Sequence, residues 1–308
     1  MIVVPSGGRA ACVGECMVEL VRTGPRTLGL GFAGDSFNTA VYLARSLGDV
    51  GRVDYISAVG TDRYSAEMVD FWRAEGIGTG RVARVPGGRV GLYLVSVDSA
   101  GERSFTYYRS DSAARSLFDS ADPFAGGGSL SDYSVVYLSG ITLSILSDPG
   151  REQLWRQLAA VRAAGGVVAF DSNYRPAGWP STASAVTAVE TTLDLTDIAL
   201  PSLDDESALF GDASPRACVD RLSRHGVKEI ALTMGRAGAL VVSDRSGAVV
   251  VPASPDVGPV LDTTAAGDSF NGAYLAGRLG GRDPIDAAAA GAALAAGVIT
   301  QRGAIIGS

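Results

Sequence analysis

The segment VLDTTAAGDSFNGAYLAG, residues 260–277, carries the residues best suited to catalysis. Its pattern predicts a strand, a tight turn of small residues, and a helix that begins near Asp268. Four backbone amides at this turn can point together at one anion: those of Ala265, Ala266, Gly267 and Asp268. A carboxylate beside such amides suits removal of a proton from an attacking hydroxyl. The alternative is that Asp268 only caps the helix, and the short motif leaves both interpretations open.

Strand and helix patterns alternate through the part of the chain that precedes this segment. Predicted strands cover 135–140, 167–173, 198–202, 229–234 and 239–244, and predicted helices cover 150–164, 183–195 and 215–225. Such alternation is typical of an α/β fold with a mostly parallel sheet covered by helices on both faces. Ligands of these sheets bind beyond the carboxyl ends of the strands, so we expect functional residues to follow the strands.

Two segments interrupt the alternation, at 16–32 and 88–109. Both read as strands with turns, and in the second the letters SAG at 99–101 separate two β-rich runs, as in a hairpin. We expect a small antiparallel sheet that stands off the main domain. It could close over a ligand or pair with a second subunit.

Composition limits the class of protein. The chain has 308 residues, 46% of them apolar, and a net charge of −7. A negative balance argues against non-specific binding of nucleic acid, although a few local arginines could still bind a small anion. The start of the chain lacks the pattern of a signal peptide, and no apolar run reaches the roughly 18 residues of a membrane helix. We expect a cytoplasmic protein with no membrane partner.

The cysteines and the histidine offer little chemistry. Cys12, Cys16 and Cys218 provide no disulfide framework and no paired zinc-ligand spacing, so we interpret them as reduced thiols. The single histidine, His225, lies far from the other motifs and is interpreted as a helix-end residue. A Ser-His-Asp triad has no other candidate histidine.

The segment DTTAAGDSF resembles the DTxGAGD signature of the ribokinase-like (PfkB) sugar kinases. Ala265 replaces the first glycine of GAGD, as in the branch of 2-keto-3-deoxygluconate kinases. The resemblance implies that Asp268 is the catalytic base and that residues 265–268 form an anion hole. It spans nearly the whole chain, which implies one kinase domain over 1–308 with the lid strands inserted.

An N-terminal signature of the same family is similar to GFAGDSFNTAVYLARSLG, residues 31–48. In the family this glycine-pair segment enters a helix and touches the sugar. Gly34 is retained, Ala33 replaces the other glycine, and Asn38 matches the asparagine that faces the substrate. The alternatives are an ordinary turn at Gly34 and a helix-start hydrogen bond at Asn38.

Nucleotide and metal positions also follow from the resemblance. The segment TMGRAGAL is similar to the strand end that lies along ATP, and PSLDDESALFG occupies the place of the N-x-x-E motif that supports Mg²⁺ through water. The residues expected to contact the nucleotide are Asn173, Ser202, Thr233, Gly235, Gly238, Ala265 and Gly267. Asp205 is the candidate metal residue, or else a solvated acid in the first turn of a helix. A monovalent cation is a further candidate cofactor.

Cations near the predicted cleft point to an acidic sugar. Arg109 ends the second lid hairpin and Arg175 follows a strand of the main sheet, and an arginine fork fits a carboxylate. By resemblance to 2-keto-3-deoxygluconate kinases, Gly34, Tyr93, Tyr107 and Arg109 bind the sugar acid, and Arg175 lies between sugar and phosphate. Alternatively, Arg175 binds ATP alone, Arg109 makes a subunit salt bridge, and the tyrosines fill the small sheet. Ala304 stands where some members carry an aspartate that contacts the sugar.

The resemblance therefore implies ATP-dependent phosphorylation of 2-keto-3-deoxygluconate on its 6-hydroxyl, with ATP and Mg²⁺ as cofactors. The alternatives are a related kinase for fructose, ribose or a keto-deoxy-galactonate, and a non-catalytic sugar-acid sensor. We also expect a homo-oligomer joined through an apolar face of the lid, for which Leu92, Leu94, Phe105 and Tyr107 are candidates.

Overall fold

The computed structural model describes residues 4, 8–97, 103–244, 247–254 and 258–307. Within these residues a nine-stranded sheet, the main sheet, has the order β13-β12-β11-β10-β9-β8-β1-β4-β5. Its strands from β11 through β5 are parallel, whereas β12 pairs antiparallel with both β11 and β13. The predicted α/β architecture is confirmed.

The strands of the main sheet are β1 Arg9–Val13, β4 Arg52–Val59, β5 Val82–Arg84, β8 Val135–Ser139, β9 Val167–Asp171, β10 Ile198–Ala199, β11 Glu229–Thr233, β12 Ala239–Ser243 and β13 Gly247–Val251. The helices are α1 Asp35–Leu47, α2 Arg63–Ala74, α3 Gly140–Ile145, α4 Asp148–Ala163, α5 Thr182–Leu193, α6 Leu203–Phe210, α7 Pro215–Arg224, α8 Ala266–Leu279 and α9 Pro284–Val298. The strands and helices predicted between 135 and 244 all form.

Alternation along the buried strands creates a hydrophobic core on each face of the main sheet. In β1, Ala10 and Cys12 pack into one core, and Ala11 and Val13 into the other. The first core is covered by side chains of α1, α2, α8 and α9, and the second by side chains of α4, α5 and α7. Period-two alternation with apolar residues on both sides is what a sheet between two helical layers requires.

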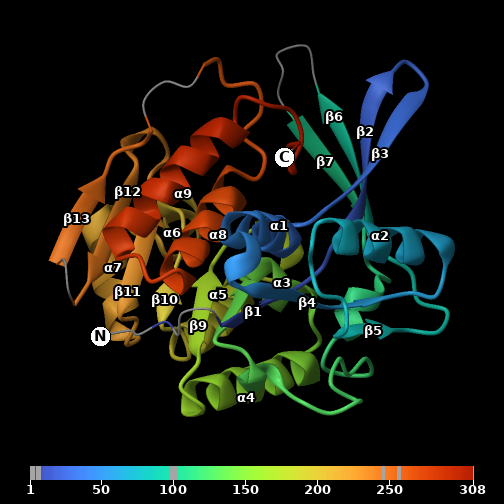
Figure 1. Cartoon of the computed structure of the whole chain (residues 1–308), viewed down its shortest axis with the longest axis horizontal. Coiled ribbons are helices and arrows are strands. Elements are labelled where there is room, and N and C mark those ends of the chain that lie inside the picture. The colour runs from blue at the N-terminus through green and yellow to red at the C-terminus, as the bar shows by residue number, and fades with distance from the viewer. Residues whose placement is uncertain (1–3, 5–7, 98–102, 245–246, 255–257, 308) are drawn as a thin grey trace.

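A second, four-stranded sheet, the lid sheet, stands away from the body of the molecule, opposite the end that carries α4 (Figure 1). Its order is β3-β2-β6-β7, from strands Thr27–Ala33, Met17–Gly24, Leu92–Val97 and Arg103–Tyr108. The outer pairs are antiparallel as predicted, but β2 and β6, which come from separate segments of the chain, pair in parallel. The turn predicted at 99–101 lies outside the described residues.

The register of the lid sheet corrects one prediction. Leu92 pairs with Tyr108 and Leu94 with Thr106, whereas Tyr93 pairs with Tyr107 and Val95 with Phe105. Paired residues share a face of a sheet, and neighbours along a strand lie on opposite faces. The prediction of one apolar face that holds Leu92, Leu94, Phe105 and Tyr107 is therefore wrong, because the leucines and the two aromatic residues lie on opposite faces.

A second correction concerns the chain before α8. The strand predicted from residue 260 does not form. The amides of Leu261 and Asp262 bond to the carbonyl of Ile299, and the Asp262 carboxylate accepts from the amides of Thr264 and Gly303. The residues with high β propensity therefore bond to the segment after α9 rather than to a strand. Among the described residues, no helix combines the length and the hydropathy that a membrane span needs.

Candidate active site

Asp268 lies in the first turn of α8, as the sequence predicted, and it is held by a residue of α1. The side-chain amide of Asn38 donates to Oδ2 of Asp268 at 2.8 Å. Burial, followed by the negative charge of Asp35, raises the pKa of Asp268 to about 7. The hydrogen bond from Asn38 and the charge of Arg175 act in the opposite direction. A carboxylate with a pKa near neutrality can exchange a proton with a substrate hydroxyl at physiological pH.

The backbone amides at the N-terminus of α8 are the second part of the candidate site. Ala265 is the N-cap of α8 and adopts a left-handed conformation, with φ of 59°. Ala266, one of the four residues whose amides are predicted to bind an anion, donates its N–H to the carbonyl of Thr263 at 3.2 Å. The amides of Ala265, Gly267 and Asp268 have no hydrogen-bond partner within the described part of the chain. They remain available to an anion at the positive end of the helix.

The N-terminus of α1 comes close to the segment after β1. Gly34 is the N-cap of α1, and a Cβ atom there would lie 2.2 Å from the carbonyl oxygen of Glu15. Only glycine permits this approach. The amide of Gly34 also donates to Oδ1 of Asn38 at 3.3 Å. One asparagine side chain therefore connects the glycine turn of α1 to Asp268.

One face of the lid sheet carries the predicted tyrosines and packs against Ala304, and this face is called the inner face. Tyr93 is buried and donates to Oε1 of Glu19 at 2.7 Å, and its ring lies 5.8 Å from the ring of Tyr107. Tyr107 itself is half exposed. Ala304 packs with Tyr93 and Val95 in one small cluster, so it contributes apolar surface beneath the inner face.

Arg109 and Glu15 form an ion pair at the base of the lid sheet. Nη2 of Arg109, which follows β7, contacts Oε2 of Glu15, which follows β1. The guanidinium of Arg109 also lies 5.8 Å from the centre of the Tyr107 ring. Arg109 is therefore bonded to a carboxylate of its own chain. The sequence interpretation did not single out Glu15, although its position just past a parallel strand could have indicated it.

Two further carboxylates gather near Asp268, and the sequence interpretation overlooked both. Asp35, in the first turn of α1, accepts from the side chain of Asn173 at 3.0 Å, and Asp171 ends β9 and accepts from Asn271 at 2.9 Å. Burial, and then the charges of Asp205 and Asp268, raise the pKa of Asp171 well above its ordinary value. Asn173, which the sequence predicts to contact the nucleotide, is buried, and its side-chain amide donates to Asp35.

The candidate metal residue is bonded to the candidate phosphate-binding arginine. Nη1 of Arg175 lies 2.8 Å from Oδ1 of Asp205. Ser202 is the N-cap of α6, and its hydroxyl accepts from the amide of Asp205 at 3.1 Å. These contacts place residues from two strand ends, β9 and β10, at one edge of the main sheet.

The predicted nucleotide segment follows β11. Thr233 ends that strand and forms a bridge with Ser202. Gly235 and Gly238 have positive φ angles of 55° and 91°, and a Cβ at Gly238 would lie 2.1 Å from the carbonyl oxygen of Val251. A pocket beside this turn is lined by Arg236, Gly258, Pro259 and Val260. The turn therefore needs its glycines and lies against an open hollow.

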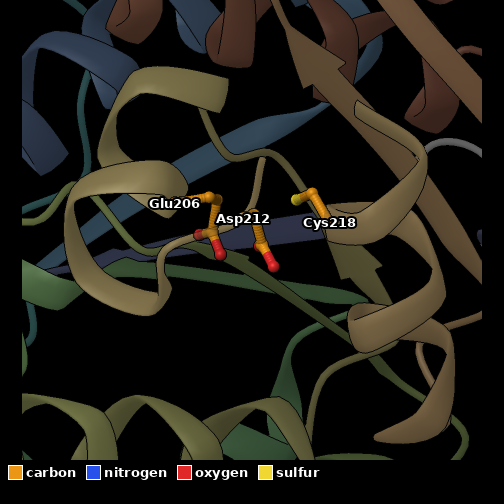
Figure 2. A group of neighbouring side chains, drawn as sticks. All are labelled: Glu206, Asp212 and Cys218. Atoms are coloured by element: carbon orange, nitrogen blue, oxygen red, sulfur yellow. The ribbon is translucent and has the colours of Figure 1, made fainter. Parts of the chain in front are cut away.

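Glu206, Asp212 and Cys218 converge from α6, the loop after it and α7, and they resemble a metal-binding group (Figure 2). Arg221 already supplies the positive charge, because its Nη2 contacts both Glu206 and Asp212. This cluster joins α6 to α7.

His225, as predicted, caps the C-terminal end of α7, where its Nδ1 lies 2.8 Å from Asp194.

Comparison with known proteins relates this geometry to a family. Residues 8–308 match the model of the pfkB family carbohydrate kinases. The chain is 42% identical over 300 residues to a 2-dehydro-3-deoxygluconokinase of Escherichia coli K12, and the alignment covers 97% of each protein.

Solved structures are also similar. A fructokinase of Vibrio cholerae with bound fructose, ADP and calcium is 26% identical, with a TM-score of 0.81 over 96% of this chain and 94% of the other. A putative ribokinase II of Escherichia coli in complex with ATP and Mg²⁺ has a TM-score of 0.80 at 24% identity, over 96% and 94% of the two chains.

Proposed function

This chain belongs to the pfkB family of carbohydrate kinases, and we propose that it phosphorylates 2-keto-3-deoxygluconate (2-dehydro-3-deoxygluconate) on its 6-hydroxyl with ATP. The relative from Escherichia coli that carries this name matches the chain over nearly its full length. The observation that carries the proposal is the pairing of Asp268 with Asn38 beside three amides that have no partner in the described part of the chain. A base and an anion site at one helix start suit phosphoryl transfer to a hydroxyl.

In this mechanism the carboxylate of Asp268 removes the proton of the 6-hydroxyl. The oxygen attacks the γ-phosphorus, the bond between that phosphorus and the β–γ bridging oxygen breaks, and ADP leaves. Asn38 holds the carboxylate in place through its 2.8 Å hydrogen bond. The amides of Ala265, Gly267 and Asp268 bind the developing negative charge, and Arg175 adds a cation on the side of Asp205.

The sugar acid would lie between the inner face of the lid sheet and the start of α1. Tyr93 and Tyr107 supply an aromatic wall, and Gly34 lets the start of α1 lie close to the backbone of Glu15. Arg109 supplies the cation for the carboxylate of the sugar acid. A fructose or ribose molecule has no carboxylate for Arg109 to bind.

The residues at the edge of the main sheet fit a hydrated Mg²⁺. Oδ1 of Asp205 is bonded to Arg175, and its Oδ2 has no hydrogen-bond partner in the described residues, so it can accept from a metal-bound water. When bound, Mg²⁺ would neutralise phosphate charge. The turn with Gly235 and Gly238 is the proposed contact for ATP, together with Ser202 and Thr233, which join it to α6.

A homodimer formed through the outer face of the lid sheet completes the proposal. That face carries Leu28, Leu30, Leu92, Leu94 and Tyr108, which share one side by register. Leu28, Leu30 and Tyr108 are exposed, at 43%, 49% and 61%. An exposed apolar patch of this kind is typical of a subunit interface.

The test of function is a coupled assay of ADP release with a panel of acceptors: 2-keto-3-deoxygluconate, its galactonate epimer, fructose and ribose. We expect the highest kcat/KM with 2-keto-3-deoxygluconate. Higher kcat/KM with fructose or ribose would support a sugar kinase but exclude the sugar acid as its preferred substrate. ATP consumption that no acceptor stimulates would remove kinase activity on all four sugars.

A further inference from the structure

The carboxylate of Glu15 holds the guanidinium that the proposed function assigns to the substrate. We propose that Glu15 is a positioning residue, which acts through Arg109 and thereby sets the preference of the site for a sugar that bears a carboxylate. This inference rests on the proposed function.

The position of Glu15 is the first support. It lies between β1 of the main sheet and β2 of the lid sheet, and Arg109 lies just past β7, at the other end of the lid sheet's chain path. Their ion pair therefore joins the two points where the chain enters and leaves the lid sheet. A guanidinium fixed at this place has a defined direction relative to both sheets.

Burial is the second support. The side chain of Glu15 is 2% exposed and that of Arg109 is 20% exposed. A carboxylate buried to this degree is costly unless a cation and hydrogen bonds accompany it. Oε1 of Glu15 and Nε of Arg109 are both buried without a hydrogen-bond partner among the described residues. The pair is thus incompletely satisfied, which is common where a ligand completes a polar network.

The surroundings restrict the arginine further. A Cβ atom at Gly91 would lie 2.8 Å from Oε1 of Glu15 and 3.2 Å from Cβ of Arg109, so the backbone closes one side of the pair. The ring of Tyr107 lies at another side. Nη2 is bonded to Glu15, whereas Nη1 has no partner in the described part of the chain. Because Nε, which also has no partner among the described residues, is buried, the group left for an incoming carboxylate is Nη1.

This arrangement has a chemical consequence. Because Glu15 neutralises Arg109, the pair attracts anions only weakly from a distance. Selection must then come from an oriented N–H donor that a carboxylate satisfies and a neutral group satisfies less well. Loss of Glu15 would let the long side chain of Arg109 take many rotamers, and binding of the sugar acid would then have to restrict them. The effect should appear in KM for the acid more than in kcat.

The experiment compares Glu15→Ala with Glu15→Gln, each in the wild-type background and in the Arg109→Ala background. Glutamine keeps an acceptor oxygen for Arg109 and avoids a stranded charge when Arg109 is absent. Kinetics are measured with 2-keto-3-deoxygluconate and with its carboxamide, which keeps the shape of the substrate but not its charge. Thermal unfolding of each variant shows that it folds.

With Arg109 present, Glu15→Ala should lower kcat/KM for the acid about tenfold or more, mainly through KM, and the carboxamide much less. Glu15→Gln should recover most of that loss. With Arg109 absent, alanine and glutamine at position 15 should behave alike, because Glu15 acts through Arg109. Two outcomes would overturn the inference and leave the proposed function intact. One is an equal loss of kcat/KM for acid and carboxamide in Glu15→Ala. The other is a difference between Glu15→Ala and Glu15→Gln that is as large without Arg109 as with it. Wild-type enzyme that does not phosphorylate the acid would overturn both.

Discussion

The side-chain amide of Asn38 donates to the carboxylate of Asp268 at 2.8 Å, although 230 positions separate them in the sequence. This bond joins α1 to α8, the two helices whose N-terminal turns build the candidate site. It restricts the rotation of the carboxylate, whose Oδ1 has no hydrogen-bond partner among the described residues and can accept from a substrate. Both helices must therefore be in place before the base is correctly oriented.

Replacement of Asp268 by asparagine tests the base. The variant keeps the shape and the contact with Asn38 but cannot accept a proton. We expect kcat to fall by roughly 10²–10⁴ while sugar affinity is largely kept. Steady-state kinetics measure the first quantity, and calorimetric titration of the sugar measures the second. A variant that retains more than about a tenth of wild-type kcat would exclude Asp268 from this role.

Two neighbours of Asp268 should move the pH profile in opposite directions. The base works when deprotonated, and its pKa of about 7 predicts a rise of kcat/KM with pH near neutrality. Asp35→Asn removes a negative charge, lowers the pKa and moves the rise to lower pH. Asn38→Ala removes a hydrogen bond to the charged form, raises the pKa and moves the rise to higher pH. If both variants moved it in the same direction, the titrating group would not be Asp268.

Arg109→Ala should lower kcat/KM for the sugar acid by roughly 10²-fold or more, because a hydrogen bond to a charged group is lost. The apparent affinity for ATP should change little. The variant also leaves Glu15 buried without its cation, so its melting temperature should fall. Arg109→Lys should restore only part of the activity, since an ammonium lacks the planar fork. Equal losses with fructose and with the acid would contradict the role in carboxylate binding.

Gly34→Ala tests the close approach of α1 to Glu15. The new Cβ would lie 2.2 Å from a carbonyl oxygen, so α1 must shift. We expect the free energy of unfolding to fall by about 1–3 kcal/mol. kcat/KM should fall as well, because Asn38 moves with the helix. Gly297→Ala is the control, since no atom lies near its Cβ position on α9 and alanine favours a helix.

Leu30→Arg tests assembly through the outer face of the lid sheet. Leu30 is half exposed, and a charge there would be buried in the proposed dimer. We expect light scattering to report a dimer for the wild type and a monomer for the variant. Val50→Arg places the same charge at an exposed apolar residue outside the lid sheet and should leave the dimer intact. A monomeric wild type at all micromolar concentrations would refute the interface.

The sequence predicted the parts of the site that lie within one continuous turn and helix. The small-residue turn before a helix indicated the geometry around Asp268, and the resemblance to the family's glycine-pair segment indicated that around Gly34; each forms a local unit. Alternating patterns likewise predicted the main sheet, because burial on both faces leaves continuous apolar strands. These features depend on neighbours along the chain.

Features that depend on distant partners could not be predicted in the same way. Glu15 is singled out only by its ion pair with Arg109. Asp35 is singled out by its hydrogen bond from Asn173 and its effect on the pKa of Asp268. No local sequence pattern indicates these interactions. The strand predicted from residue 260 failed because the amides of Leu261 and Asp262 bond to Ile299 rather than to a strand. The assignment of faces in the lid sheet required its register, which a list of apolar residues does not contain.

That register gives each lid strand two separate surfaces. On β6, Tyr93 lies on the inner face and Leu92 on the outer face, and on β7 the same division separates Tyr107 from Tyr108. Substitutions at odd and even positions should therefore affect the proposed sugar site and the proposed dimer interface independently, even though the residues are adjacent in the sequence. An insertion of a single residue into β7 would exchange the two sets at once, because every side chain beyond it would change sides. We expect this strand to tolerate many substitutions in evolution but few changes of length.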